Sequence, residues 1–119
     1  MSKKQVVVID YGMGNLWSVA SAVRFLGAEA LITTDTKEIS SAKFLILPGV
    51  GSFRRAMQVI KQNSIDQAIL QSLSQSENKL LGICLGMQLL GSASSEDGDT
   101  PGLGLIPNTV KKFTNTSDT

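Results

Sequence analysis

Residues 44–60 read FLILPGVGSFRRAMQVI, and this stretch decides the fold class. It opens with four consecutive apolar residues, a pattern typical of a strand buried on both faces of a parallel sheet. The Pro-Gly-Val-Gly sequence at 48–51 ends that strand, and Ser52 can cap a helix that follows. The apolar face of this helix would carry Phe53, Ala56, Met57 and Ile60. The stretch therefore predicts a buried strand, a tight turn and an amphipathic helix.

A second unit of the same kind precedes this one. Residues 6–9 are Val-Val-Val-Ile, which again predicts a strand buried on both faces. Asn15 can cap the helix that follows, and Gly27 is placed to end it. A short strand is expected at residues 30–33. The first half of the chain thus alternates strand and helix.

The second half of the chain continues this alternation. Ser64 and Gln67 have the spacing of a capping box, which predicts the start of another helix. Residues 79–83 are typical of a strand, and residues 85–90 of the helix after it. A last strand is expected at residues 110–113.

Strands that alternate with helices imply right-handed crossovers and predict an α/β fold with a doubly wound, mostly parallel sheet. We expect a single domain over residues 1–119, with a disordered tail over about residues 114–119. Ligands of such sheets bind outside the carboxyl ends of the strands. Three unusual turns follow strands, at residues 11–15, 48–52 and 82–86. We therefore expect the chemistry at that edge.

The composition excludes several classes of function. The 119 residues include one cysteine and no histidine, and 11 basic against 10 acidic residues leave a net charge of +1. A single thiol excludes an internal disulfide, and without histidine neither the usual zinc ligand sets nor a Cys–His pair can form within the chain. The charge lacks the basic footprint of nucleic-acid binding, and no apolar run suits a signal peptide or a membrane span. We expect a cytoplasmic protein with no metal, nucleic-acid or membrane partner.

The turn at residues 82–86, Gly-Ile-Cys-Leu-Gly, has the spacing of a nucleophile elbow between a strand and a helix. Glycines flank the nucleophile in such elbows because side chains there would collide with the packed strand and helix. The turn would place the Cys84 thiol at a helix N-terminus, which favours thiolate, and aim the Leu85 N–H at an oxyanion. The alternative is a buried Cys84 that acts as a small apolar residue.

The other two turns each have a plain alternative. The glycine-rich turn at 48–51 could hold an oxyanion with backbone N–H groups, or it could be a tight turn that needs positive φ. Residues 12–17, Gly-Met-Gly-Asn-Leu-Trp, suggest a dinucleotide-binding motif, with Asp35 at the distance of a ribose-binding acid. Trp17 occupies the place of the third glycine, where we expect an indole to push the helix off the strand. A nucleotide-binding domain is therefore the weaker hypothesis.

The three turns together resemble the class I (triad) glutamine amidotransferases. Residues 82–88, Gly-Ile-Cys-Leu-Gly-Met-Gln, resemble their nucleophile elbow. Residues 10–16, residues 48–51 and the Gly-Leu-Gly-Leu-Ile sequence at 102–106 are most similar to the glutaminase subunit of imidazole glycerol phosphate synthase, the HisH family. The resemblance runs from about residue 5 to residue 113, and Asn108 stands where the family pattern has glycine. It implies a flavodoxin-like amidotransferase fold, here its N-terminal portion.

The resemblance implies a definite chemistry without a cofactor. Cys84 would attack the carboxamide of glutamine, giving a glutamyl thioester and ammonia. The N–H of Leu85, with that of Val50 or Gly51, would stabilise the oxyanion, and in the family the glycine-rich strand needs a peptide reorientation first. Gln88 and Gly51 would bind the substrate.

The resemblance also implies a partner. Tyr11 and Asn15 would face a (β/α)8-barrel cyclase, which receives the ammonia through an internal tunnel and forms imidazole glycerol phosphate in histidine biosynthesis. The family's triad is completed by a His and a Glu in an H-x-E arrangement, which lies beyond residue 119.

We therefore expect the chain to be a truncated glutaminase with negligible activity of its own, and to be marginally stable or self-associating unless another chain covers its sheet edge. The alternatives are a non-catalytic flavodoxin-like module that only binds the cyclase, and the nucleotide-binding domain.

Overall fold

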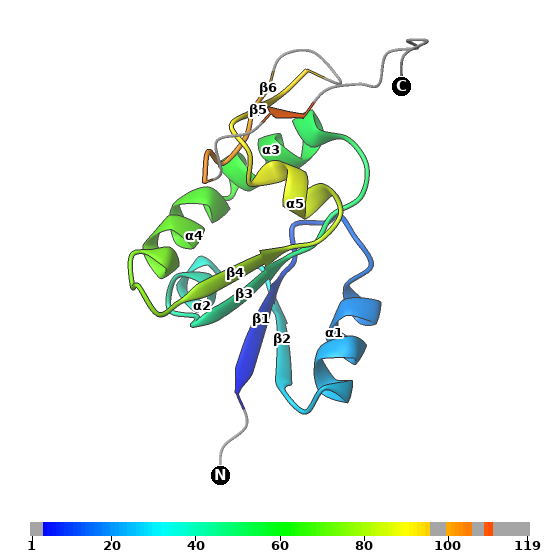
Figure 1. The fold of residues 1–119 in the computed structure, drawn as a ribbon, viewed down its shortest axis with the longest axis vertical. Coiled ribbons are helices and arrows are strands. Elements are labelled where there is room, and N and C mark those ends of the chain that lie inside the picture. The colour runs from blue at the N-terminus through cyan, green and yellow to red at the C-terminus, as the bar shows by residue number, and fades with distance from the viewer. Residues whose placement is uncertain (1–3, 96–99, 106–108, 111–119) are drawn as a thin grey trace, which may run out of the picture.

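Four parallel strands form the central sheet of the computed structural model, which describes residues 4–95, 100–105 and 109–110 (Figure 1). Their order is β2-β1-β3-β4. These strands are β1 (Gln5–Ile9), β2 (Glu29–Thr33), β3 (Phe44–Leu47) and β4 (Lys79–Gly82). The first strands pair outward from β1 on both sides, so the connections cross over as in a doubly wound sheet. The predicted fold class is confirmed.

Helices cover both faces of this sheet (Figure 1). On one face, α1 (Leu16–Phe25) packs Val23 against Val8 and Ile46 of the strands. On the other face lie α2 (Thr36–Ser40), α3 (Phe53–Gln62) and α4 (Ile65–Leu73), which share the larger core with β1 and β3. The short helix α5 (Leu85–Leu89) follows β4 at its carboxyl end. The predicted strand–turn–helix unit at 44–60 is thus β3, its turn and α3.

Two of the predicted helix caps are confirmed, and a third is wrong. The side chains of Asn15 and Ser52 accept hydrogen bonds from the N–H groups of Ser18 and Arg55, both at 3.3 Å. At Ser64 the predicted capping box is absent, because this residue has a φ of 58° and its side chain makes no cap hydrogen bond. A left-handed backbone at this position turns the hydroxyl away from the first helical turn, so the local S-x-x-Q spacing is not sufficient.

A second, three-stranded sheet lies beyond α5. It has the order β6-β5-β7 and contains β5 (Ala93–Ser94), β6 (Thr100–Pro101) and β7 (Thr109–Val110). The strand predicted at 110–113 therefore begins at residue 109. Residues 111–113, Asn108 and the predicted tail at 114–119 lie outside the described residues.

The free edge of β4 and the sheet face beside it are apolar and open. Within the described residues β4 pairs with β3 alone, and the Leu81 side chain is 57% exposed. A groove of about 320 Å³ runs along this face, and its apolar lining includes Val6, Ile46 and Leu81. The expected marginal stability or self-association is consistent with this surface and stays a prediction.

Candidate active site

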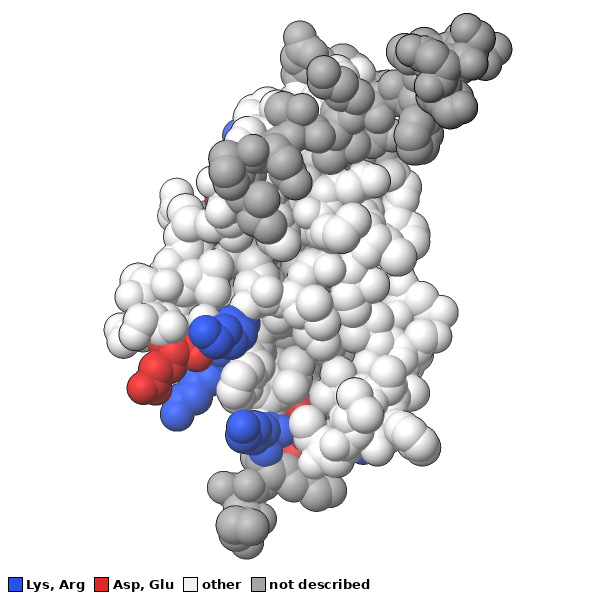
Figure 2. All heavy atoms as spheres, viewed as in Figure 1, with Lys and Arg blue, Asp and Glu red and all other residues white. Residues whose placement is uncertain are grey.

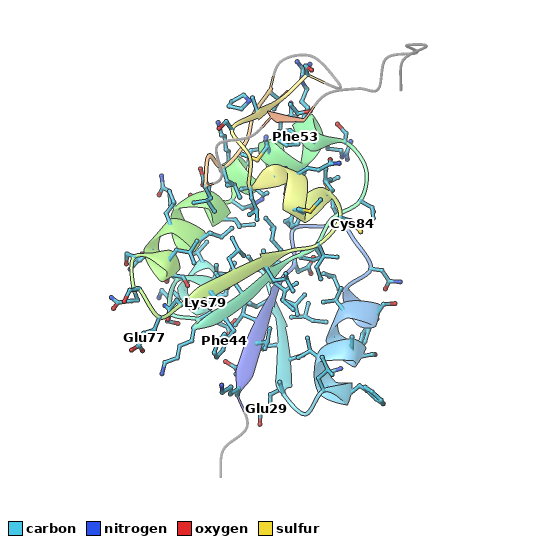
Figure 3. The ribbon with its side chains drawn as sticks, in the orientation of Figure 1. Glu29, Phe44, Phe53, Glu77, Lys79 and Cys84 are labelled. Atoms are coloured by element: carbon cyan, nitrogen blue, oxygen red, sulfur yellow. The ribbon has the colours of Figure 1, made fainter. Side chains whose placement is uncertain are left out.

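Cys84 stands in a strained turn between β4 and α5. Its backbone has φ 55° and ψ −121°, and Ser64 is the other non-glycine residue with positive φ in the described part of the chain. A non-glycine residue held there costs about 1–3 kcal/mol, and such strain is concentrated at functional sites. The thiol is exposed at the carboxyl end of β4 (Figure 3), so the alternative of a buried apolar Cys84 is wrong.

The glycines on both sides of Cys84 are required by packing, as predicted. A Cβ added to Gly86 would overlap the carbonyl oxygen of Leu47 on the neighbouring strand. A Cβ on Gly82 would lie 2.8 Å from the backbone of Gly86 and Met87, closer than real Cβ contacts come. The elbow therefore fits only because both positions lack side chains.

The glycine-rich turn at residues 48–51, which we call the oxyanion turn, lies directly beside the elbow. Three consecutive carbonyl groups tie it down. The Leu47 carbonyl accepts from the Ile83 N–H at 3.0 Å, and the Gly49 carbonyl accepts from the Leu85 N–H at 3.1 Å. Between them, the Pro48 carbonyl accepts from the Tyr11 hydroxyl at 2.5 Å. Two of these bonds come from the residues on either side of Cys84.

The predicted oxyanion donor on Leu85 is therefore occupied in this structure. Its N–H donates to the Gly49 carbonyl, which belongs to the same peptide group as the Val50 N–H. In a trans peptide the C=O and N–H point in opposite directions, so the Val50 N–H faces away from Leu85. Val50 itself is 60% exposed, and Gly51 has a φ of +102°.

The Tyr11 side chain is buried within this chain, and its position in the region that faces a partner stays a prediction. Only 4% of its surface is exposed, and its ring belongs to the larger core. Its hydroxyl donates inside the molecule, to the Pro48 carbonyl, because a buried carbonyl needs a hydrogen-bond donor. Burial raises the pKa of this phenol well above its usual value.

We expect the stability of the chain to fall at high pH because of Tyr11, the single tyrosine of the sequence. Its raised pKa means that the unfolded chain releases the proton first. The free energy of unfolding should be independent of this group well below pH 10 and then fall with a slope that approaches about 1.4 kcal/mol per pH unit, until the folded chain ionises as well. Denaturant unfolding across this pH range measures the slope, and an ultraviolet titration in which the folded chain ionises at the ordinary tyrosine value would contradict the expectation.

The loop after β1 completes the edge, so the three predicted turns do meet. A Cβ on Gly14 would lie 3.2 Å from the Gly49 nitrogen, and one on Gly51 would lie 3.3 Å from the Met13 methyl carbon. Asn15 is exposed at the start of α1, as its predicted partner-facing position requires. Whether it contacts a partner stays a prediction.

Gln88 lies one helical turn after Cys84. The Gln88 N–H donates to the Cys84 carbonyl at 3.4 Å, and Gln88 is half-buried in α5. The predicted role of Gln88 and Gly51 in binding substrate is not tested by these contacts.

The features that suggested a nucleotide have structural roles instead. Asp35 caps α2, a short helix that the sequence did not predict, by accepting from the Lys37 N–H at 2.8 Å. Gly14 packs on the oxyanion turn. The expectation that Trp17 pushes its helix off the strand is wrong, because the side chain is 73% exposed and so is not packed between the helix and the strand.

A segment that the sequence interpretation did not connect to the site, residues 102–105, caps the end of the nucleophile helix. The N–H groups of Leu103 and Leu105 donate to the Leu89 and Leu90 carbonyls at 2.8 and 2.9 Å. Gly102 and Gly104 donate likewise to the Ser92 and Gly91 carbonyls, both at 2.9 Å. The available signal was Gly102, where an added Cβ would overlap the Gly91 carbonyl. The unpaired carbonyls at a helix end need donors such as the N–H groups of this segment.

We expect Gly102→Ala to loosen α5. The new Cβ would overlap the Gly91 carbonyl and lie 3.0 Å from the Leu89 oxygen and the Phe53 ring, so the cap must shift. Hydrogen exchange should accelerate at the Leu103 and Leu105 amides, and the free energy of unfolding should drop by about 1–3 kcal/mol. Exchange rates that match those of the unsubstituted chain would show that the segment tolerates the methyl group.

Backbone groups dominate this edge of the molecule. Figure 2 shows that the charged side chains on the face in view gather near the amino ends of the strands, where Figure 3 places Glu77 and Lys79, away from Cys84. In the described ranges no three His, Cys, Asp or Glu side chains lie close enough together to hold a metal ion. No helix there is long and apolar enough to cross a membrane.

Two solved structures share this fold. A crystal structure of a glutamine amidotransferase superposes with a TM-score of 0.74 at 22% identity, covering 88% of this chain and 55% of that one. A protein described as a peptidase E, from Listeria monocytogenes, gives a TM-score of 0.70 at 15% identity, with 88% of this chain and 64% of that one covered. At these identities the comparison establishes the fold.

Sequence relatives are more specific. Imidazole glycerol phosphate synthase subunit HisH of Bacillus cereus is 46% identical over 108 residues, and that of Geobacillus kaustophilus is 48% identical over 106 residues. These matches cover 91% and 89% of the chain but 51% and 50% of the relatives, so the chain spans about half the length of the curated relatives it matches. The family model of the CobB/CobQ-like glutamine amidotransferase domain matches residues 17–116. The chain belongs to the glutamine amidotransferase family.

Proposed function

We propose that this chain forms the part of a glutaminase that carries the nucleophile, and that the glutaminase releases ammonia from glutamine. The resemblance to the subunit HisH of imidazole glycerol phosphate synthase implies this activity. The observation that carries the proposal is the exposed, left-handed Cys84 beside the oxyanion turn. A strained elbow of this kind presents a nucleophile above the edge of a parallel sheet, with a backbone N–H adjacent to it. The relatives in two genera carry the name of the same subunit.

The reaction begins with the sulfur of Cys84. Its thiolate attacks the side-chain carbonyl carbon of glutamine, and the carbonyl electron pair moves onto oxygen to give a tetrahedral oxyanion. Collapse of this intermediate breaks the C–N bond, and the nitrogen leaves as ammonia after it takes up a proton. Water then hydrolyses the glutamyl thioester to glutamate and restores the thiol. The proton transfers need a general base, and the 119 residues include no histidine.

We infer that the oxyanion hole opens by rotation of one peptide group, between Gly49 and Val50. The rotation breaks the bond from the Leu85 N–H to the Gly49 carbonyl, which frees the first donor. It also turns the Val50 N–H toward the site, which supplies the second donor. The contacts thus favour Val50 over Gly51 as the second donor. Gly51, at a φ of +102°, is a glycine and can absorb the change.

The substrate and partner follow from the same proposal. Gln88 and Gly51 bind the polar groups of glutamine, and Asn15, exposed beside the oxyanion turn, faces a (β/α)8-barrel cyclase. Ammonia passes to that cyclase, which forms imidazole glycerol phosphate in histidine biosynthesis. The assembly is a heterodimer in the cytoplasm, and no cofactor takes part.

Alkylation of Cys84 tests this proposal. A chloromethyl ketone analogue of glutamine should modify Cys84 with a rate that saturates, and free glutamine should protect the thiol. Iodoacetamide, which needs no oxyanion hole, reports the exposure of the thiol alone and serves as the control. Equal, unsaturated reaction with both reagents would show that no glutamine site exists. A chain that binds the cyclase but shows that result would be the non-catalytic module, and a rise in melting temperature with a nucleotide would favour the nucleotide-binding domain.

A further inference from the structure

We propose that Tyr11 is a positioning residue that holds the Pro48–Gly49 peptide still, so that rotation in the oxyanion turn is confined to the next peptide, Gly49–Val50. This inference rests on the proposed function, because it concerns the same oxyanion hole. The observation behind it is the hydrogen bond from the Tyr11 hydroxyl to the Pro48 carbonyl, at 2.5 Å and buried, between residues 37 positions apart.

The first of the two peptides, Pro48–Gly49, is held by the proline ring and by the hydrogen bond to its carbonyl. Proline fixes its own φ through its ring, and the carbonyl before it, on Leu47, is bound by the Ile83 N–H. The Pro48 carbonyl is buried, and its bond to Tyr11 would be lost if the peptide turned over. An unpaired buried carbonyl costs about 1–3 kcal/mol, so this peptide stays in place.

The second peptide has the opposite character. Its carbonyl is bound by the Leu85 N–H, the group that the oxyanion itself needs. Val50 is largely exposed, and the residues before and after it are glycines, which tolerate both signs of φ. Rotation here therefore meets little steric resistance and releases a donor rather than leaving one buried.

Tyr11 is itself well anchored, which a positioning group must be. Its ring lies in the larger core, and it is 4% exposed. Gly49 fits under the hydroxyl only without a side chain, because an added Cβ would overlap the Tyr11 oxygen. A phenol is protonated over the whole neutral range, and burial raises the pKa of Tyr11 further, so the hydroxyl remains a donor. The three groups form one close contact that neither Phe at 11 nor Ala at 49 can reproduce.

Relaxation dispersion of backbone ¹⁵N nuclei in the 119-residue chain tests the inference, because it detects exchange on the microsecond-to-millisecond scale. In the unsubstituted chain the Gly49 amide, which shares the pinned peptide, should show no exchange. Tyr11→Phe keeps the ring and removes the bond, and the Gly49 amide should then gain a clear exchange contribution. If the Gly49 amide of Tyr11→Phe shows no exchange contribution, the inference is overturned, even if other residues show exchange.

Ser72→Ala is the matched control. Ser72 is fully buried, and its hydroxyl donates to the Ala42 carbonyl at 2.7 Å near the amino end of β3. The Ser72→Ala substitution removes a buried hydroxyl–carbonyl hydrogen bond of the same kind, away from the site. The Gly49 amide should therefore show no exchange contribution in this variant. An exchange contribution at Gly49 in this variant as well would reduce the Tyr11 effect to general loosening and reject the positioning role.

A second variant disrupts the hydrogen bond between Tyr11 and Pro48 through a change at Gly49. Gly49→Ala should displace the Tyr11 hydroxyl and give the same exchange at the amide of residue 49, so the test survives if one variant does not fold. In the alkylation assay, Tyr11→Phe should lower the rate with the glutamine chloromethyl ketone about 10-fold while the iodoacetamide rate holds. Equal slowing with both reagents counts against the positioning role. An unsubstituted chain that shows no preference for the ketone rejects the proposed function, while the exchange at Gly49 decides the role of Tyr11 separately.

Discussion

Gly86→Ala should destabilise the chain by about 3 kcal/mol or more and lower the melting temperature by on the order of 10 °C. The added Cβ would overlap the Leu47 carbonyl oxygen and approach the Leu47 carbonyl carbon and the Pro48 carbonyl carbon. All of these are backbone atoms, which cannot step aside as a flexible side chain can. The whole of α5 must move away from β3, and the bonds that link the elbow to Leu47 and Gly49 must lengthen.

The predicted loss of stability is opposite in sign to the effect that helix propensity alone would give. Gly86 lies inside α5, where helix propensity alone favours alanine by about 1 kcal/mol. Gly27→Ala is the matched control, because its Cβ would meet nothing within 4 Å and its cost comes from the positive φ of 93° alone, about 1–2 kcal/mol. Thermal and denaturant unfolding of both variants measure the difference. A Gly86→Ala chain as stable as Gly27→Ala, or more stable than the unsubstituted one, would mean that the elbow is not packed against β3 as described.

The strands and the elbow could be predicted because local pattern and tertiary environment agree. β3 occupies Phe44–Leu47, the apolar run of the sequence, and Leu45, Ile46 and Leu47 are all buried. The glycines around Cys84 have a single physical reason, the close packing of strand and helix, and that reason is visible in the spacing alone. Where a single interaction determines which residue type a position allows, that interaction can be predicted from the sequence.

What escaped prediction depends on residues far apart in the chain. The resemblance placed Tyr11 in the region that faces a partner, and nothing local in the sequence indicates that its hydroxyl donates to the buried carbonyl of Pro48, 37 positions later. The cap that residues 102–105 place on α5 is another bond between distant segments. Ser64 failed as a cap because its backbone is left-handed, which residue type alone does not reveal.

These hydrogen bonds between segments far apart in the chain all hold the backbone around Cys84. The Leu47 and Gly49 carbonyls bind the residues on either side of the nucleophile, the Pro48 carbonyl binds Tyr11, and the far end of α5 is capped by residues 102–105. A residue held at a φ of 55° needs such support, since the strain would otherwise relax. The network therefore holds Cys84 in its strained backbone conformation, independent of any side chain that acts as base.

Incubated with glutamine, the 119-residue chain should release no more ammonia than its Cys84→Ala variant. In the proposed mechanism the elbow supplies a nucleophile and the oxyanion turn supplies donors, but the leaving nitrogen must still receive a proton. A positioned acid–base group contributes about 10²–10⁴ in rate, and loss of the histidine of a triad can cost more because its members act as a unit. No histidine is present to do this, and the acidic and basic side chains on the face shown in Figure 2 lie away from the elbow.

A coupled assay for glutamate and ammonia measures this turnover, with iodoacetamide alkylation run in parallel to show that the thiol is present and accessible. The informative combination is a saturable reaction with the glutamine chloromethyl ketone together with no turnover. It would separate binding and nucleophilic attack, which we propose for these residues, from proton transfer, for which the 119 residues include no histidine. Ammonia release tenfold above the Cys84→Ala control would mean that another group within the 119 residues acts as the base, and the assignment of the missing step to a histidine would be wrong.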